Sequence, residues 1–128
     1  MNLLLDTHIL LWHLADNPKL SFEASDLIEN DDHQKFLSIV SLWEIEIKRN
    51  IGKLDITQPI ETLLPKEIII LPLNIEHIGH LKNLPFHHRD PFDRIIIAQA
   101  IVEKFTVITD DGFFKSYDVP ILDVMLRS

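Results

Sequence analysis

Short apolar segments alternate with helical segments along this chain, and this alternation most constrains its fold. The apolar segments cover residues 3–5, 36–40, 68–71, 106–109 and 119–122. A continuously apolar strand needs cover on both faces, which is typical of a parallel sheet between two layers of helices. We therefore predict a three-layer α/β/α sandwich with a mainly parallel central sheet, built from right-handed βαβ crossovers. The length of 128 residues predicts a single domain over residues 1–128.

Capping residues indicate where the helices begin. Thr7 precedes one helical segment, and Asp90 precedes another that has proline at its first position. Ser41 and Glu44 have the spacing of a capping box, which predicts that a helix opens there and ends near Gly52. The segment 36–40 would then be entirely strand.

Four carboxylates occupy places that such a sheet would bring together. Asp6 and Asp111 follow predicted strands, whereas Glu44 and Asp93 lie at the starts of helices. Ligands of parallel sheets bind outside the carboxyl ends of the strands. Carboxylates crowded at that edge repel one another unless a cation lies among them. We therefore predict that these four acids are the catalytic and metal-binding residues of a Mg²⁺ or Mn²⁺ site, because both ions prefer oxygen ligands.

A divalent ion at this edge predicts chemistry on phosphate esters. Such an ion binds a phosphodiester oxygen, activates a water molecule and stabilises the developing negative charge. The chain has no cysteine, so a thiolate nucleophile and disulfides are excluded, and water is the expected nucleophile. The N-terminus lacks the pattern of a signal peptide, and no apolar run reaches the roughly 18 residues of a spanning helix. We expect a cytoplasmic protein without a membrane anchor.

Each acid also has an ordinary structural explanation. Asp6 can cap a helix, Glu44 can pair with a lysine one turn later, and Asp93 is favourable at a helix N-terminus. Asp110 and Asp111 precede a glycine in a turn pattern, and either can be the fourth acid. The joint placement of the acids, rather than any one of them, favours the metal site.

The net charge of -8 is unusual for an enzyme that acts on nucleic acid, because such proteins normally carry a basic stripe. Basic residues do gather locally, for example at Arg89 and Arg94 near the predicted site. An acidic surface also favours a basic protein partner. His77 and His80 have helical ligand spacing, but no companion ligand is evident, so we do not expect a zinc site.

Four blocks of the sequence resemble the PIN domain, and specifically the VapC-type toxins of bacterial type II toxin–antitoxin systems. The blocks are residues 5–12 (LDTHILLW), 41–45 (SLWEI), 88–100 (HRDPFDR running into IAQA) and 109–111 (TDD). They span nearly the whole chain, and the third block is the most specific. The resemblance implies a PIN-like fold, a Mg²⁺- or Mn²⁺-dependent endoribonuclease, a small antitoxin partner with a basic tail, and a homodimer.

The resemblance also implies roles for individual residues. Asp6, Glu44 and Asp93 match the three core acids of the family, and Asp111 matches its more variable fourth position. The residues expected to support the site are Thr7, Ser41, Asp90, Arg94, Thr109 and Asp110, and those expected to bind substrate phosphates are His88 and Arg89.

Two other functions remain open from the sequence. One is a metal-dependent phosphatase on a similar α/β sheet, although Asp6 lacks the second acid two residues later that covalent phosphoryl transfer uses. The other is a PIN-fold binding domain without catalytic activity. The presence of all four acids argues against this second alternative.

Overall fold

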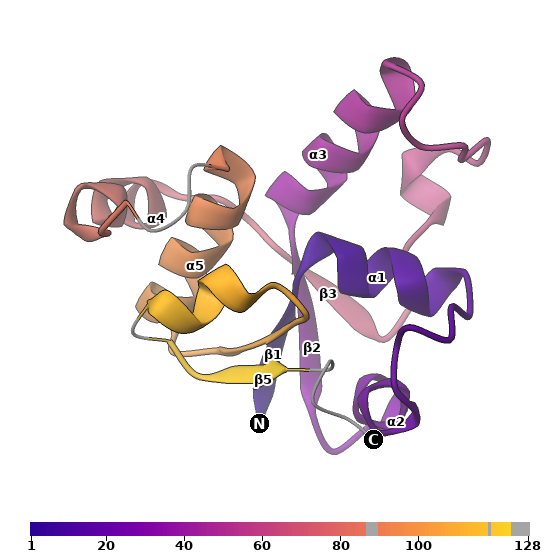
Figure 1. Cartoon of the computed structure of the whole chain (residues 1–128), viewed down its shortest axis with the longest axis horizontal. Coiled ribbons are helices and arrows are strands. Elements are labelled where there is room, and N and C mark those ends of the chain that lie inside the picture. The colour runs from indigo at the N-terminus through magenta and orange to yellow at the C-terminus, as the bar shows by residue number, and fades with distance from the viewer. Residues whose placement is uncertain (87–89, 118, 124–128) are drawn as a thin grey trace.

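In the part of the chain that the structure describes, five parallel strands form one sheet in the order β3-β2-β1-β4-β5 (Figure 1). The computed structural model describes residues 1–86, 90–117 and 119–123. The strands are β1 (Asn2–Leu5), β2 (Gln34–Ser38), β3 (Ile68–Leu71), β4 (Thr106–Thr109) and β5 (Ile121–Asp123). All four neighbouring pairs are parallel, as predicted. The chain winds outward from β1 to β3 and then returns to β4, so the winding reverses between β1 and β4.

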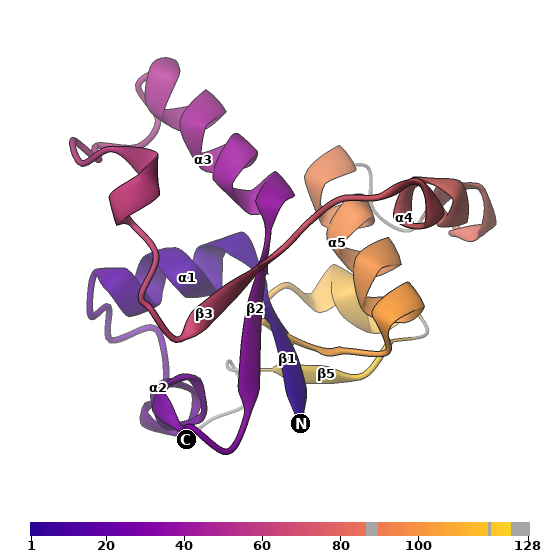
Figure 2. The ribbon, with the colours of Figure 1, turned by 180° about the vertical axis from the view of Figure 1, so that it is seen from behind.

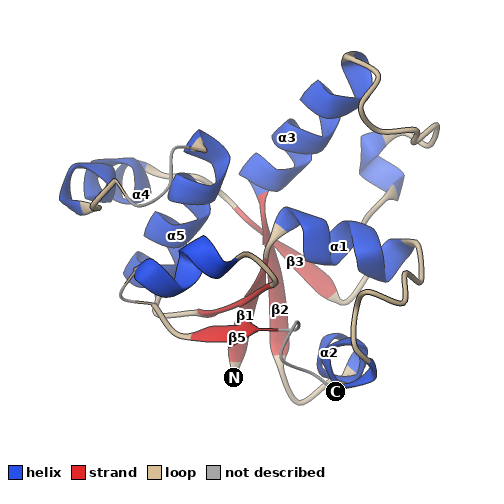
Figure 3. Ribbon diagram, in the orientation of Figure 1, coloured by secondary structure: helices blue, strands red, loops and turns tan. Residues whose placement is uncertain are grey.

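Helices cover both faces of the sheet and extend beyond its carboxyl edge (Figures 2 and 3). The α-helices are α1 (Thr7–Leu14), α2 (Phe22–Glu29), α3 (Ile39–Asn50), α4 (Ile75–His80) and α5 (Pro91–Glu103). Short 3₁₀ helices are η1 (Ile60–Thr62), η2 (Leu81–Asn83) and η3 (Gly112–Ser116). Among the helices that the structure describes, none is long and apolar enough to cross a membrane.

Alternate side chains of β1 enter two separate apolar cores. Leu3 and Leu5 pack with residues of α1 and α2 on one face, whereas Leu4 packs with residues of α5 on the other. All three leucines are 0% exposed. This double coverage is what the continuously apolar strand predicted, and it confirms the three-layer sandwich.

The boundary between β2 and α3 lies earlier than predicted. Ser38 ends the strand and caps the helix, since its side chain accepts a hydrogen bond from the Val40 amide at 3.1 Å. The predicted capping box of Ser41 and Glu44 is therefore wrong, and both residues lie inside the first turns of α3. Gly52 follows the helix with a positive φ of 78°, so the predicted end of the helix is confirmed.

Two other boundaries show how closely capping patterns locate the helix starts. The predicted cap at Thr7 is wrong, because Asp6 is the N-cap residue of α1 and Thr7 is the first helical residue. The predicted cap at Asp90 is confirmed, since its Oδ1 accepts hydrogen bonds from the amides of Phe92 at 2.9 Å and Asp93 at 3.3 Å. The last strand begins at Ile121, two residues later than predicted.

We expect Ser38→Ala to lower the free energy of unfolding by about 1 kcal/mol or more, as the loss of a helix cap does. The side chain of Ser38 is fully buried, so the Val40 amide would also lose its partner away from water. Urea unfolding measures the change. Ser25→Ala, within α2, is the control and should be nearly neutral. Equal stability of Ser38→Ala and the wild type would contradict a cap at this position.

Candidate active site

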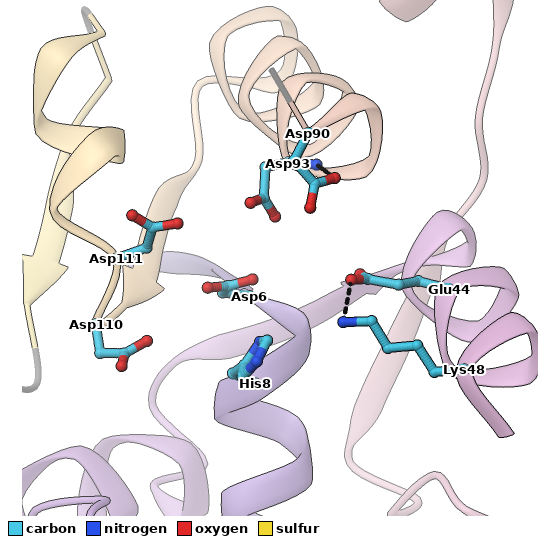
Figure 4. Close-up of a pocket in the computed structure, with 8 residues that line it drawn as sticks. All are labelled: Asp6, His8, Glu44, Lys48, Asp90, Asp93, Asp110 and Asp111. Atoms are coloured by element: carbon cyan, nitrogen blue, oxygen red, sulfur yellow. Dashed lines mark hydrogen bonds and ion pairs between the residues drawn. The ribbon is translucent and has the colours of Figure 1, made fainter. Parts of the chain in front are cut away.

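A pocket of about 240 Å³ opens at the carboxyl edge of the sheet, where the winding reverses. Among the residues that the structure describes, six carboxylates and two basic side chains line it (Figure 4). The lining residues are Asp6, His8, Glu44, Lys48, Asp90, Asp93, Asp110 and Asp111. The four acids predicted as catalytic residues therefore come together here from the end of β1, from α3, from α5 and from the turn after β4.

Asp6 lies at the centre of this arrangement. Its amide donates to the Ile108 carbonyl at 3.0 Å, which ties the end of β1 to β4. Its Oδ2 accepts a hydrogen bond from the Thr109 hydroxyl at 2.9 Å. The carboxyl is only 3% exposed. Burial raises the pKa of Asp6 to about 6, and the charge of Glu44 adds to this effect, against the hydrogen bond from Thr109. A cation beside Asp6 would oppose both of these effects.

Glu44 is held from two helices. The Thr7 hydroxyl donates to its Oε1 at 2.8 Å, and the Lys48 ammonium lies 2.9 Å from its Oε2. Ser41 lies 2.8 Å from the Thr7 hydroxyl oxygen. Because the Thr7 proton is used toward Glu44, Ser41 is the donor in this second contact. Thr7 and Ser41 thus position Glu44, and neither acts as a helix cap.

The N-terminus of α5 and the turn after β4 supply the other acids. Asp93 lies in the first turn of α5, and Asp90 both caps this helix and lines the pocket. Asp110 and Asp111 both line the pocket, so either can take the fourth position. The Asp111 amide donates to the Thr109 hydroxyl oxygen at 3.0 Å, which links this turn to Asp6 through Thr109.

Arg94 does not reach the site in the structure. Its guanidinium donates to the Pro85 carbonyl at 2.9 Å and lies 4.0 Å from the centre of the Phe86 ring. Adjacent helical residues point about 100° apart, so Arg94 faces the preceding loop when Asp93 faces the pocket. The supporting role expected for Arg94 is therefore replaced by a structural one. The predicted phosphate-binding residues His88 and Arg89 lie outside the described residues.

Two residues of the pocket were not predicted as site residues. His8 directly follows Thr7 in α1, and Lys48 was noted only as a possible helical partner of Glu44. The spacing of four residues between Glu44 and Lys48 was the available signal. His77, by contrast, is buried in α4, where its ring pairs with Glu103 at 2.7 Å and completes a capping box with Asn74.

The chemistry of the donor set suits a hard divalent cation. All of the acids in the pocket offer oxygen ligands, which Mg²⁺ and Mn²⁺ prefer. Within the described residues, no three His, Cys, Asp or Glu side chains form a group that could hold one ion. Mg²⁺ is usually bound by only one or two carboxylates and keeps several water molecules. The residues therefore fit an ion that two carboxylates hold directly and others through water.

Comparison with known proteins gives a family and a set of similar folds. Residues 3–120 match the sequence model of the PIN domain. No curated protein matches the chain.

Three solved structures illustrate the similarity of fold. One is the crystal structure of VapBC2 from Rickettsia felis bound to a DNA fragment from its promoter. It has a TM-score of 0.73 and 16% identity, and the match covers 96% of this chain and 98% of that chain. VapBC-1 from nontypeable Haemophilus influenzae has a TM-score of 0.66 and 20% identity, covering 96% and 98%. A toxin–antitoxin complex from Klebsiella pneumoniae has a TM-score of 0.65 and 18% identity, covering 93% and 94%. At these identities the likeness shows the fold.

Proposed function

The chain belongs to the PIN domain family, and on this premise we propose that it is a Mg²⁺- or Mn²⁺-dependent endoribonuclease. The observation that carries this proposal is the convergence of acids from four separate segments on one pocket at the carboxyl edge of the sheet. A purely structural use of these acids as caps and turn residues would not require them to share a pocket. The substrate is RNA, and the bonds hydrolysed are phosphodiesters.

Different residues of the chain have different roles at such a site. Asp6 and Asp93 are the principal ligands of the ion, with Glu44 and Asp111 holding its water molecules or a further cation. A bound divalent ion supplies Lewis-acid stabilisation of the phosphate oxygens and activates water for attack. Thr109 fixes the Asp6 carboxylate, and Thr7 with Ser41 fixes that of Glu44. This support keeps the acids in place before substrate binds, which lowers the cost of reorganisation during the reaction.

The direct test is cleavage of RNA by the purified chain. Cleavage should require Mg²⁺ or Mn²⁺ and should stop when a chelator removes the ion. Activity on phosphate monoesters in place of RNA would favour the alternative of a phosphatase. Metal binding without hydrolysis of either substrate would favour a binding domain.

We further propose that this nuclease is the VapC-type toxin of a type II toxin–antitoxin pair and acts in the cytoplasm as a homodimer. Toxin–antitoxin complexes are among the proteins of similar fold. The net charge of -8 and the six carboxylates of the pocket favour a small antitoxin whose tail carries Arg or Lys.

We expect a small protein encoded beside this chain to bind it through such a basic tail. Replacing a tail Arg that contacts the acids by alanine should weaken binding by about tenfold or more, since a hydrogen bond to a charged group contributes about 1.5–3 kcal/mol. Titration calorimetry at low and high salt measures both the affinity and its electrostatic part, and binding should weaken as salt rises. Isolation of the chain from its native operon without any such partner would count against the toxin proposal.

A further inference from the structure

We propose that the Lys48 ammonium is a built-in cation of the active site, which occupies the place beside Glu44 that a second divalent ion would take. The chain then binds one divalent ion, on the side of Asp6, instead of two. This inference rests on the proposed function, because it concerns how the same acids share their cations. It assigns a positioning role to a residue that the sequence pattern did not mark as part of the site.

The contacts of Glu44 leave little room for another cation. Its Oε1 accepts the hydrogen bond from Thr7 at 2.8 Å, and its Oε2 lies 2.9 Å from the Lys48 ammonium. Each carboxylate oxygen thus already has a close donor. A divalent ion bound directly to Glu44 would lie close to the Lys48 ammonium, and the two positive charges would repel each other. Asp6 differs, because its contact at Oδ2 is the neutral hydroxyl of Thr109.

The burial of the pair shows why the lysine stays in place. The Glu44 side chain is 4% exposed, whereas that of Lys48 is 33% exposed. An exposed pair with this spacing rearranges easily and contributes little. Here the carboxylate is buried, and a buried carboxylate without a partner is strongly unfavourable. Lys48 therefore compensates the Glu44 charge at all times and does not depend on the concentration of metal ions.

A divalent ion held on the Asp111 side of Asp6 would lie across the acid cluster from Lys48. Figure 4 shows Asp110 and Asp111 on one side of the pocket, Glu44 with Lys48 on the other, and Asp6 between them. In a two-ion site, a pair of divalent ions about 3.5–4 Å apart shares the charge of the phosphate. With Lys48 at one of the two positions, a single ion suffices beside Asp6, and the ammonium supplies positive charge on the Glu44 side.

The number of bound ions tests this inference without RNA. We would titrate Mn²⁺ into the full chain and count bound ions by calorimetry and by the paramagnetic resonance of free Mn²⁺. The wild type should bind one ion per chain. Lys48→Met removes the ammonium from Glu44, so this variant should bind a second ion. Its affinity for that second ion should be at least about tenfold higher than any residual affinity of the wild type for one. Lys48→Arg retains the positive charge and should still bind one ion.

Two further variants separate the role of Lys48 from general effects. Lys53→Met makes the same change of net charge at an exposed lysine outside the pocket, and it should bind one ion. The double variant Lys48→Met/Glu44→Gln should lose the second ion, which locates that ion at Glu44. Circular dichroism checks that each variant is folded, and Lys48→Gln replaces Lys48→Met if the latter is not.

The outcomes separate this inference from the proposed function. Two ions in the wild type, or one ion in both the wild type and Lys48→Met, would overturn the role of Lys48 and leave the metal-dependent nuclease intact. No bound Mn²⁺ in any variant would overturn both. One ion in the wild type and two in Lys48→Met, with the second lost on Glu44→Gln, is the expected result.

Discussion

Replacing Asp6 or Asp93 by asparagine is expected to lower metal-dependent RNA cleavage by more than about 100-fold, because even the loss of groups that only support metal ligands costs 10–100-fold. The two residues lie on different elements, Asp6 after β1 and Asp93 in the first turn of α5, yet they line one pocket. An amide keeps the shape of the side chain, and in Asp6→Asn the amide oxygen can still accept from Thr109. The substitution therefore removes the charge and leaves the packing in place. Single-turnover cleavage of a labelled RNA at saturating Mn²⁺ measures the effect.

The matched control for this comparison is Asp26→Asn. Asp26 is exposed on α2 and lies outside the pocket, so its loss makes the same change in net charge without touching the site. This variant should cleave as the wild type does. Full cleavage by Asp6→Asn or by Asp93→Asn, in a chain that is folded, would place the chemistry elsewhere in the molecule.

The strands and the acids at their ends were predictable because their signals are local. Segments 3–5 and 68–71 are short apolar runs, segment 106–109 has two β-branched apolar residues between threonines, and each of the three forms a strand in the structure. A parallel sheet aligns the carboxyl ends of its strands, so residues such as Asp6 and Asp111 that follow them must lie at one edge. The convergence of the acids thus needed only the strand pattern and the assumption of parallel pairing.

The details that sequence did not predict depend on tertiary contacts. The pattern of Ser41 and Glu44 suits a capping box, but both side chains are used by Thr7, which comes from another helix. Ser38 caps α3 instead, at a position where the preceding segment still looks like a strand. The side chain of Arg94 was expected near the acids because of its place in the sequence, whereas its helical phase turns it toward the Pro85 carbonyl. None of these choices can be made from local spacing alone.

The stabilisation of the fold by divalent metal ions is expected to depend on Asp6. An ion that binds only the folded chain stabilises it by about 2.7 kcal/mol at a hundredfold excess over its Kd. Since 1 kcal/mol shifts the melting temperature of a domain by about 2–8 °C depending on its size, we expect Mn²⁺ or Mg²⁺ to raise the melting temperature of the wild type by roughly 8 °C. The increase should be much smaller in Asp6→Asn, because the variant lacks a principal ligand.

Without metal, Asp6→Asn should be as stable as the wild type or more stable at neutral pH. Burial raises the pKa of Asp6 from 3.8 to about 6, so the folded chain binds this proton more tightly than the unfolded chain does. Folding is then favoured at low pH, and stability is lost as the pH rises from 3.8 through about 6. A shift of this size corresponds to about 1–3 kcal/mol at neutral pH, which the neutral amide would recover.

Thermal melts of both proteins, with a chelator and with Mn²⁺, at pH 5 and pH 7.5, measure the effect of the metal and the effect of the Asp6 charge. The advantage of the variant should shrink at pH 5, where Asp6 is largely protonated. An identical response to Mn²⁺ in the two proteins would show that Asp6 does not bind the ion, and the metal site would then have to be built from the remaining acids of the pocket.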